Sequence, residues 1–409
     1  MKDHEDFPII PLVRGEGAKL FDTQGKSYID AISSWWVNLF GHAHPHIVSA
    51  IAKQASSLEH AIFAGFTHEP AVRLAERLAT MTGLPRLFFA DNGSAAVEIA
   101  LKLAYHYFHN QGQERPYFVS LTGSYHGETM GALAVGDLGL YKEAYKALLM
   151  RTLQSPAPKD RTIEAAIEAA EAMARLLHER GHEVAAVIVE PLVQCAGGMA
   201  MHDPEFIRRV RALCDQFGIF LIHDEIAVGF GRTGTMFAFE QAGIKPDLLC
   251  LSKGLTGGFL PMSVVMMREE IYVAFYEDYH PQRSFLHSHS YTGNPLACAA
   301  ANATLDLFEE EEWITRNRQT AQKMAELLTP LVHHRKVREV RSKGMIAAVE
   351  LHDLSDPRPA RTMMRKALLQ GVLLRPLGNV LYLMPPYVIS DEELVKCVEV
   401  MKMVIDEVE

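Results

Sequence analysis

Residues 217–258 read FGIFLIHDEIAVGFGRTGTMFAFEQAGIKPDLLCLSKGLTGG, and this stretch decides the fold. Its apolar runs 219–222 and 248–251 are typical of buried strands in a parallel sheet. The first run leads into Asp224 and the second into Lys253. Ligands of open α/β sheets bind beyond the carboxyl ends of the strands. The sequence therefore predicts that this carboxylate and this amine face one crevice.

Asp224 and Lys253 suit the chemistry of pyridoxal 5'-phosphate (PLP). A lysine in an apolar site loses its proton readily and forms a Schiff base with an aldehyde. A buried carboxylate keeps a pyridine nitrogen protonated, which makes the ring an electron sink. Taken alone, the two residues fit equally well a solvated strand-end lysine and an aspartate that caps a helix. At this point the cofactor is one of two interpretations.

The composition narrows the class of protein. The chain has 409 residues, a formal net charge of -10 and 48% hydrophobic residues, which favours about two to three domains. The negative charge argues against nucleic acid or an anionic membrane as a partner. The acidic N-terminus lacks the apolar segment of a secretion signal, and no apolar run reaches the roughly 20 residues of a membrane span. The 5 cysteines form no CxxC pair and indicate a reduced, cytoplasmic protein.

Strand and helix patterns alternate from about residue 85 to about residue 270. This alternation predicts an α/β fold with a mostly parallel central sheet and helices on both faces. Asp203 and Pro204 mark the start of one helix, and Gly218 marks its end. From about residue 310 the pattern is that of a smaller α+β domain, whose last helix begins with a capping box at Ser390. We expect residues 1–45 in the N-terminal part of the small domain, 46–310 in a large cofactor-binding domain and 311–409 in the C-terminal part of the small domain.

Two polar turns follow predicted strands in the first half of the chain. Gly93 and Ser94 lie between a strand at 87–90 and a strong helix, an arrangement that serves either as an anion site or as an ordinary helix cap. Tyr125 lies in TGSYHG at 122–127, after a strand at 117–121. Its ring either lies flat on a ligand or packs locally.

Aromatic, cationic and imidazole side chains supply the other candidates. In an extended chain, Trp35 and Trp36 point to opposite sides, and they either fill the core or form the wall of a ligand pocket. Arg375 follows a strand and is either a surface residue or a clamp for a carboxylate. The histidine groups at 42–46 and 287–289 lack a further nearby metal ligand, so we expect no metal site.

The loop 229–234, GFGRTG, matches the glycine pattern of dinucleotide-binding proteins. That pattern requires a helix that opens at the second and third glycines. The residues after Gly234 show no clear amphipathic face. A nicotinamide-dependent oxidoreductase is therefore a distant alternative.

Together these motifs resemble the class III, fold-type I PLP-dependent aminotransferases, and within them the adenosylmethionine-8-amino-7-oxononanoate aminotransferases of biotin synthesis. The general features are Asp224-Glu225, GFGRTG and Ser252-Lys253-Gly254. The narrower group is indicated by SSWW at 33–36, FAGFTHEPA at 63–71, ADNGSAAVEIALK at 90–102, YHGET at 125–129, EPLVQCAGGM at 190–199, TGNPLACAAA at 292–301 and RPLGNVLYLMPPY at 375–387. The resemblance covers nearly the whole chain.

The resemblance implies roles for single residues. Lys253 forms the Schiff base and shuttles the proton, and Asp224 pairs with the pyridinium nitrogen. Gly93 and Ser94 hold the phosphate, and Ser290, with His289 beside it, completes that site from the partner subunit of a homodimer. Contacts to the ring or to the substrate are implied for Tyr125, Trp35, Trp36, Arg232, Ser288, Arg375 and Tyr382. Arg375 holds the oxononanoate carboxylate.

The reaction implied by the resemblance is ping-pong transfer of an amino group from S-adenosylmethionine to 8-amino-7-oxononanoate, which yields 7,8-diaminononanoate. Lysine replaces S-adenosylmethionine in some members. The alternative within the family is a class III enzyme that acts on lysine, ornithine or an omega-amino acid.

The chain departs from the family pattern in two places. HSHS at 287–290 stands where some members have HGPT, and the Ser290 hydroxyl can replace that of threonine. The aromatic HPYTQ-type motif of the family would precede Met1. If the chain natively begins there, we expect lower activity.

Overall fold

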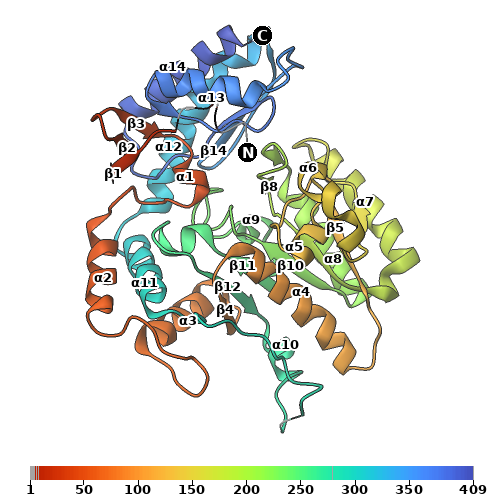
Figure 1. Ribbon diagram of the computed structural model, residues 1–409. Coiled ribbons are helices and arrows are strands. Elements are labelled where there is room, and N and C mark those ends of the chain that lie inside the picture. Colours follow the sequence, from red (N-terminus) through yellow and green to blue (C-terminus); the bar gives the residue numbers. More distant parts are fainter. Residues whose placement is uncertain (1–4, 6, 8, 279, 409) are drawn as a thin grey trace. The chain divides into compact units, whose positions relative to one another are not determined.

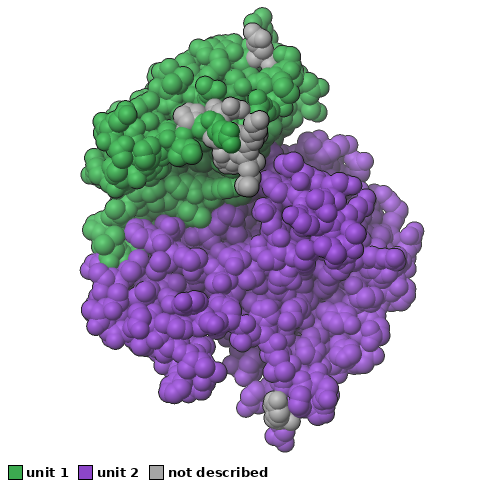
Figure 2. Space-filling model, viewed as in Figure 1, with its two compact units in different colours: residues 1–48, 315–409 green, residues 49–314 purple. Residues whose placement is uncertain are grey.

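The computed structural model describes residues 5, 7, 9–278 and 280–408 (Figure 1). The chain divides into two compact units, coloured green and purple in Figure 2. Unit 1 comprises residues 1–48 and 315–409, and unit 2 comprises residues 49–314. Much of the N-terminal segment in which no secretion signal is expected lies outside the described residues. In the described part of the chain, no helix has the length and apolar character needed to cross a bilayer.

Unit 2 is built on a seven-stranded sheet with the strand order β4-β12-β11-β10-β7-β5-β6. Strand β10 runs parallel to both β11 and β7, whereas β12 runs antiparallel to β11 and β4. The expected mostly parallel sheet is thus confirmed. The strands are β4 (Arg86–Ala90), β5 (Tyr117–Leu121), β6 (Leu153–Ser155), β7 (Val184–Val189), β10 (Phe220–Asp224), β11 (Leu248–Leu251) and β12 (Ser263–Met267).

Helices cover both faces of this sheet, as Figure 1 shows. Ile222 of β10 belongs to the core beneath α4 (Gly93–Asn110). Its neighbour Leu221 belongs to the core beneath α7 (Ile163–Arg180) and α8 (Pro204–Phe217). Successive side chains of a strand alternate between faces, so Asp224 shares the α4 face with Ile222.

The other elements of unit 2 connect the strands or flank the sheet. The expected cap of α8 is present, because the Asp203 side chain accepts a hydrogen bond from the N–H of Glu205 at 2.8 Å. Gly218 ends that helix with φ of 60°, which glycine adopts without strain. The remaining elements are α3 (Glu69–Thr82), α5 (Met130–Val135), α6 (Gly139–Lys142), β8 (Val193–Gln194), β9 (Ala200–Met201), α9 (Phe239–Ala242), α10 (Glu269–Val273) and α11 (Pro295–Glu310); α2 (Pro45–Ala55) crosses the boundary between the units.

Unit 1 joins the two ends of the chain in one core. Strand β15 (Val372–Leu373) pairs in parallel with β3 (Ser27–Asp30), which continues the sheet of β1 (Leu12–Glu16) and β2 (Lys19–Asp22). A second sheet contains β13 (Val337–Lys343), β14 (Ile346–Leu351) and β16 (Val380–Leu383). The helices of this unit are α1 (Ser33–Trp36), α13 (Pro359–Leu369) and α14 (Asp391–Glu407), together with most of α12 (Trp313–Leu328). The expected capping box of α14 is present at Ser390 and Glu393.

The chain is not extended at the two tryptophans. Ser33, Ser34, Trp35 and Trp36 all have positive φ, between 46° and 75°, so they form a left-handed turn. Trp36 is buried, with 4% of its surface exposed, whereas Trp35 is 49% exposed. One indole therefore fills the core and the other faces outward. The left-handed turn, and not the alternation of side chains along a strand, gives them these different directions.

Candidate active site

The carboxyl ends of adjacent strands bring the candidate groups of unit 2 together. Asp224 ends β10 and Lys253 follows β11, which pairs with β10. Glu190 follows β7 on the other side of β10. Tyr125 and His126 lie in the turn after β5, which pairs with β7. Parallel neighbours end at the same edge of a sheet, so the topology itself builds this cluster.

Asp224 is paired with a histidine. Oδ2 of Asp224 lies 2.8 Å from Nδ1 of His126, and Oδ1 accepts a hydrogen bond from the N–H of Ile226 at 3.1 Å. Because a carboxylate accepts, Nδ1 of His126 carries the hydrogen. Nε2 of His126 is buried and has no hydrogen-bond partner within the described residues. The pair orients the Asp224 carboxylate at the sheet edge.

Glu190 is a second buried carboxyl group of the cluster. Its Oε1 accepts the N–H of Tyr125 at 2.9 Å, and its Oε2 accepts the N–H of Cys195 at 3.1 Å. Burial, with a further contribution from Asp224, raises the pKa of Glu190 to about 7, against the opposing effect of His126. Glu190 thus ties the turn after β5 to the segment after β7.

Lys253 has the electrostatic setting of a reactive amine. Burial lowers the pKa of Lys253, although the acidic groups Asp224, Cys195 and Glu190 oppose the shift. The lysine adopts a φ of 31° at the start of a 3-10 turn. The adjacent Ser252 hydroxyl donates to the carbonyl oxygen of Met262 at 2.7 Å. A lowered pKa increases the fraction of neutral amine, which is the form that attacks an aldehyde or accepts a proton.

The N-terminus of α4 lies against the turn after β5. Asn92 caps this 18-residue helix by accepting the N–H of Ala95 at 3.0 Å. The Ser94 hydroxyl lies 3.3 Å from the N–H of Glu128. A Cβ at Gly127 would lie only 2.1 Å from Oγ of Ser94. Because no side chain fits at Gly127, the turn can approach the helix end closely, and that end offers backbone N–H groups to an anion.

Tyr125 lies half-buried beside this helix end. Its hydroxyl donates to Glu128 at 3.0 Å, and its ring centroid lies 5.5 Å from that of Tyr141. Burial and the Glu128 hydrogen bond raise the pKa of Tyr125. The phenol is therefore held neutral, as a flat aromatic surface beside the cluster.

These groups fit an aromatic ring that carries an aldehyde, a basic nitrogen and a phosphate. The helix end and Ser94 suit a phosphate, and Asp224 suits a protonated ring nitrogen. Lys253 suits the aldehyde. Nε2 of His126 is a buried polar atom with no hydrogen-bond partner among the described residues, so it remains available to a bound group. The residues present are therefore compatible with PLP.

The other predicted residues lie in the GFGRTG loop, in another cavity of unit 2 and in unit 1. Arg232 is buried in the GFGRTG loop, and its charge opposes the rise that burial causes in the pKa of the Cys195 thiol. Because Glu190, Lys253 and Asp224 act on the same thiol, Arg232 lies near the cluster. Ser288, His289 and Ser290 line another cavity of unit 2, together with Ile62 and Phe88. Trp35, Trp36, Arg375 and Tyr382 belong to unit 1.

The four residues in unit 1 form two linked pairs. The Trp36 indole N–H donates to the Tyr382 hydroxyl at 3.0 Å. The Arg375 guanidinium lies 4.1 Å from the centroid of the Trp35 ring, within range of a cation–π interaction. Residues separated by about 340 positions in the sequence thus meet in one aromatic and cationic group.

Sequence reasoning missed His126, Glu190 and Cys195. Glu190 was detectable, because it follows a buried strand in the same way as Asp224 does. His126 had no such signal, since only the turn geometry brings its ring to Asp224. The GFGRTG loop runs into turns, and the next helix begins only at Phe239. The helix that a dinucleotide site requires is therefore missing at these glycines.

Comparisons with known proteins now decide the family. The aminotransferase class-III family model matches residues 1–405. The chain belongs to the class III aminotransferases. It is 47% identical to the adenosylmethionine-8-amino-7-oxononanoate aminotransferase of Helicobacter pylori, over 100% of this chain and 94% of that protein.

Solved structures of other transaminases have the same fold. The crystal structure of the adenosylmethionine-8-amino-7-oxononanoate aminotransferase from Methanocaldococcus jannaschii matches with a TM-score of 0.95 and 34% identity, covering 100% of this chain and 95% of that one. An amine transaminase from an uncultivated Pseudomonas species, in a PLP-bound form, matches with a TM-score of 0.93 and 32% identity, covering 100% and 97%. The fold-type I architecture expected from the sequence is thereby confirmed.

Proposed function

We propose that this class III aminotransferase uses PLP to transfer an amino group from S-adenosylmethionine to 8-amino-7-oxononanoate, giving 7,8-diaminononanoate. The cluster of Lys253, Asp224 and His126 supports transamination. The observation that supports this acceptor is the Arg375–Trp35 stack beside the Trp36–Tyr382 pair. The acceptor has a carboxylate at the end of a polymethylene chain. A guanidinium suits that carboxylate, and indole faces suit that chain.

When bound, PLP supplies a ring that stabilises the negative charge left on a substrate carbon after proton removal. The residues of this chain perform the remaining tasks. Asp224, oriented by His126, would keep the ring nitrogen protonated, and Tyr125 would cover the ring. With PLP bound, Lys253, whose pKa is lowered, would take a proton from the donor carbon and pass one to the cofactor in the first half-reaction. In the second it would move a proton from the cofactor to the acceptor carbon. The amine is exchanged at one site in two steps, which makes the kinetics ping-pong.

An absorbance titration tests this function. The purified enzyme, supplied with PLP, should show the yellow band of cofactor bound to Lys253, and S-adenosylmethionine should bleach it. Adding 8-amino-7-oxononanoate should restore the band. If lysine bleaches the band and S-adenosylmethionine does not, the amino donor is lysine and the proposed acceptor stands. Bleaching only by ornithine or 4-aminobutyrate would refute the proposal, as would near-normal turnover by Lys253→Ala.

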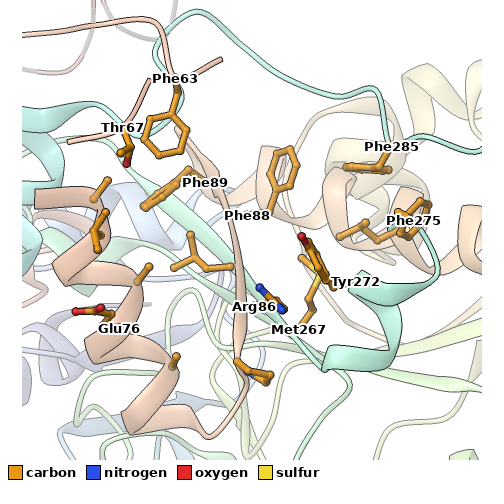
Figure 3. A pocket seen from close by; sticks show the side chains of 17 residues that line it. Phe63, Thr67, Glu76, Arg86, Phe88, Phe89, Met267, Tyr272, Phe275 and Phe285 are labelled. Atoms are coloured by element: carbon orange, nitrogen blue, oxygen red, sulfur yellow. The ribbon is translucent and has the colours of Figure 1, made fainter. Parts of the chain in front are cut away.

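We also propose a homodimer in which Ser290, with His289 beside it, completes the phosphate site of the partner subunit. An apolar face of unit 2 supports this proposal. Phe63, Phe88, Phe89 and Phe285 line a cavity of about 630 Å³, shown in Figure 3. The cavity that contains the Ser288–Ser290 loop shares Phe63, Phe88 and Phe89 with it.

The exposed residues near these cavities strengthen the case for a protein interface. Ile62, Phe66, Leu286 and Tyr291 are each at least 63% exposed. A monomer rarely leaves so many large apolar side chains in one region open to water. A second copy of the chain would cover them and would bring a Ser290 hydroxyl with it.

Mixed dimers test the shared site. Lys253→Ala and Ser290→Ala each impair their own homodimers. In a mixed dimer of the two variants, one site keeps both Lys253 and a Ser290 supplied by the partner, so activity should recover. If no activity recovers although sedimentation shows mixed dimers, Ser290 acts within its own subunit or not at all.

A further inference from the structure

The left-handed turn Ser33–Trp36 requires an external constraint. Its four consecutive residues have φ of 52°, 46°, 72° and 75°. For L-residues this region is unfavourable, because Cβ crowds the following carbonyl oxygen. None of the four is glycine, so the strain is not relieved locally. Such a conformation persists only where the surrounding contacts enforce it.

The Asp30 carboxylate contacts the first half of the turn and a histidine that follows it in the sequence. Its Oδ2 accepts the Ser34 hydroxyl at 2.7 Å and lies 3.0 Å from Nε2 of His42. Its Oδ1 lies 3.4 Å from the N–H of Ile32. Asp30 has no exposed surface. A buried charge is stable only when such partners surround it, so carboxylate and turn stabilise each other.

His42 is oriented for this role by Asn38. Oδ1 of Asn38 accepts the N–H of Gly41 at 2.8 Å, which turns its amide nitrogen toward Nδ1 of His42, 3.3 Å away. Nδ1 therefore accepts, and Nε2 carries the hydrogen that points to Asp30. Donation thus runs from Gly41 through Asn38 and His42 to the Asp30 carboxylate, which also accepts from Ser34.

The other side of the turn carries the candidate substrate contacts. Trp36 donates to Tyr382, and Trp35 lies under the Arg375 guanidinium. The Ser33 hydroxyl donates to the carbonyl oxygen of Met384 at 2.8 Å, which ties the turn to the segment after β16. A relaxed, right-handed or extended turn would move both indoles away from these partners.

We infer that Asp30 and His42 are positioning residues for acceptor specificity. They hold Ser33–Trp36 left-handed, so that the Trp35–Arg375 and Trp36–Tyr382 pairs stand ready for the carboxylate end of the acceptor. The inference rests on the proposed function for the identity of that acceptor. Asp30 and His42 act through the turn and are given no contact with the substrate.

Kinetics of matched variants test the inference. Asp30→Asn and His42→Phe should raise the KM for 8-amino-7-oxononanoate by at least about tenfold, since small misplacement of binding groups is costly. PLP occupancy, read from the visible band, should not change. The matched control is Asp22→Asn, because Asp22 is also buried in unit 1 but holds the turn after β2 through Gln24 and Lys26. A KM within about twofold of wild type for Asp30→Asn, or an equal rise for Asp22→Asn, would overturn the inference.

Rescue separates positioning from general destabilisation. Glycine tolerates positive φ, so adding Ser34→Gly to Asp30→Asn should lower the raised KM again. A double variant with a KM as high as that of Asp30→Asn would contradict the inference. If Asp30→Asn does not fold, Ser34→Ala removes the hydroxyl alone and should still raise the KM.

Tryptophan fluorescence makes the test independent of the substrate. The chain has 3 tryptophans, and Trp313→Phe leaves only the two in the turn. In that background, Asp30→Asn should shift the emission to longer wavelength as Trp36 loses its buried site, whereas Asp22→Asn should not. An unchanged emission would refute the inference. If the wild-type enzyme does not use 8-amino-7-oxononanoate but Asp30→Asn still shifts the emission, only the proposed acceptor is refuted.

Discussion

Nδ1 of His126 lies 2.8 Å from Oδ2 of Asp224, and neither side chain is more than 5% exposed. The pair predicts the effect of Asp224→Asn. An amide would set an N–H against the N–H of His126 and remove the charge that keeps the ring nitrogen protonated. We expect kcat to fall by about a hundredfold or more, with the fold intact by circular dichroism. A kcat within tenfold of wild type would exclude the assigned role.

The sequence predicted the sheet because its strands are short, uninterrupted apolar runs with charged residues just after them. Asp224 and Lys253 were found by that rule, and Glu190 obeys it too. The left-handed turn was beyond prediction. Its conformation depends on contacts with Asp30, His42 and Tyr382. The sequence pattern of residues 33–36 itself gives no sign of these contacts.

Glu190 predicts a pH dependence of stability. Its pKa in the folded chain is about 7, above the ordinary value of 4.5. The folded state therefore holds the proton more tightly than the unfolded state does, and the free energy of unfolding falls as pH rises from 4.5 to 7. Glu190→Gln removes this pH-dependent contribution. Across that range, the free energy of unfolding of the wild type should therefore fall by up to about 3 kcal/mol relative to that of the variant.

Denaturant unfolding at several pH values measures the Glu190 effect. Glu179→Gln, which removes an exposed carboxylate of α7, is the control and should follow the wild-type profile. A wild-type minus Glu190→Gln difference that stays constant with pH would show that Glu190 does not titrate in this range.

Gly127 predicts a selective loss of cofactor affinity. Its φ is 127°, and a Cβ there would meet Oγ and Cα of Ser94 at 2.1 and 3.1 Å. Gly127→Ala must therefore displace the N-terminus of α4, and we expect PLP to bind at least about tenfold more weakly. Equilibrium dialysis followed by absorbance measures this affinity.

Gly123→Ala is the matched control for Gly127→Ala. Gly123 has a φ of 70° in the same turn, but a Cβ there meets nothing within 4 Å. The control should cost about 1–2 kcal/mol of stability through backbone strain and leave PLP affinity near that of wild type. If both variants lose the cofactor equally, strain in the turn explains the loss and the contact with Ser94 does not.

The Arg375–Trp35 stack predicts coupling between two substrate contacts. Because the guanidinium lies 4.1 Å from the ring centroid, Trp35→Ala removes an aromatic face and also releases Arg375. Trp35→Ala and Arg375→Ala should each raise the KM for 8-amino-7-oxononanoate and leave PLP occupancy unchanged. In the double variant the two effects should fall short of additivity by about 0.5–1 kcal/mol, the range for a cation–π contact at a half-exposed site. Trp35→Phe, which keeps an aromatic face, should retain most of the coupling, and strict additivity in the Trp35→Ala cycle would mean that the stack does not orient Arg375.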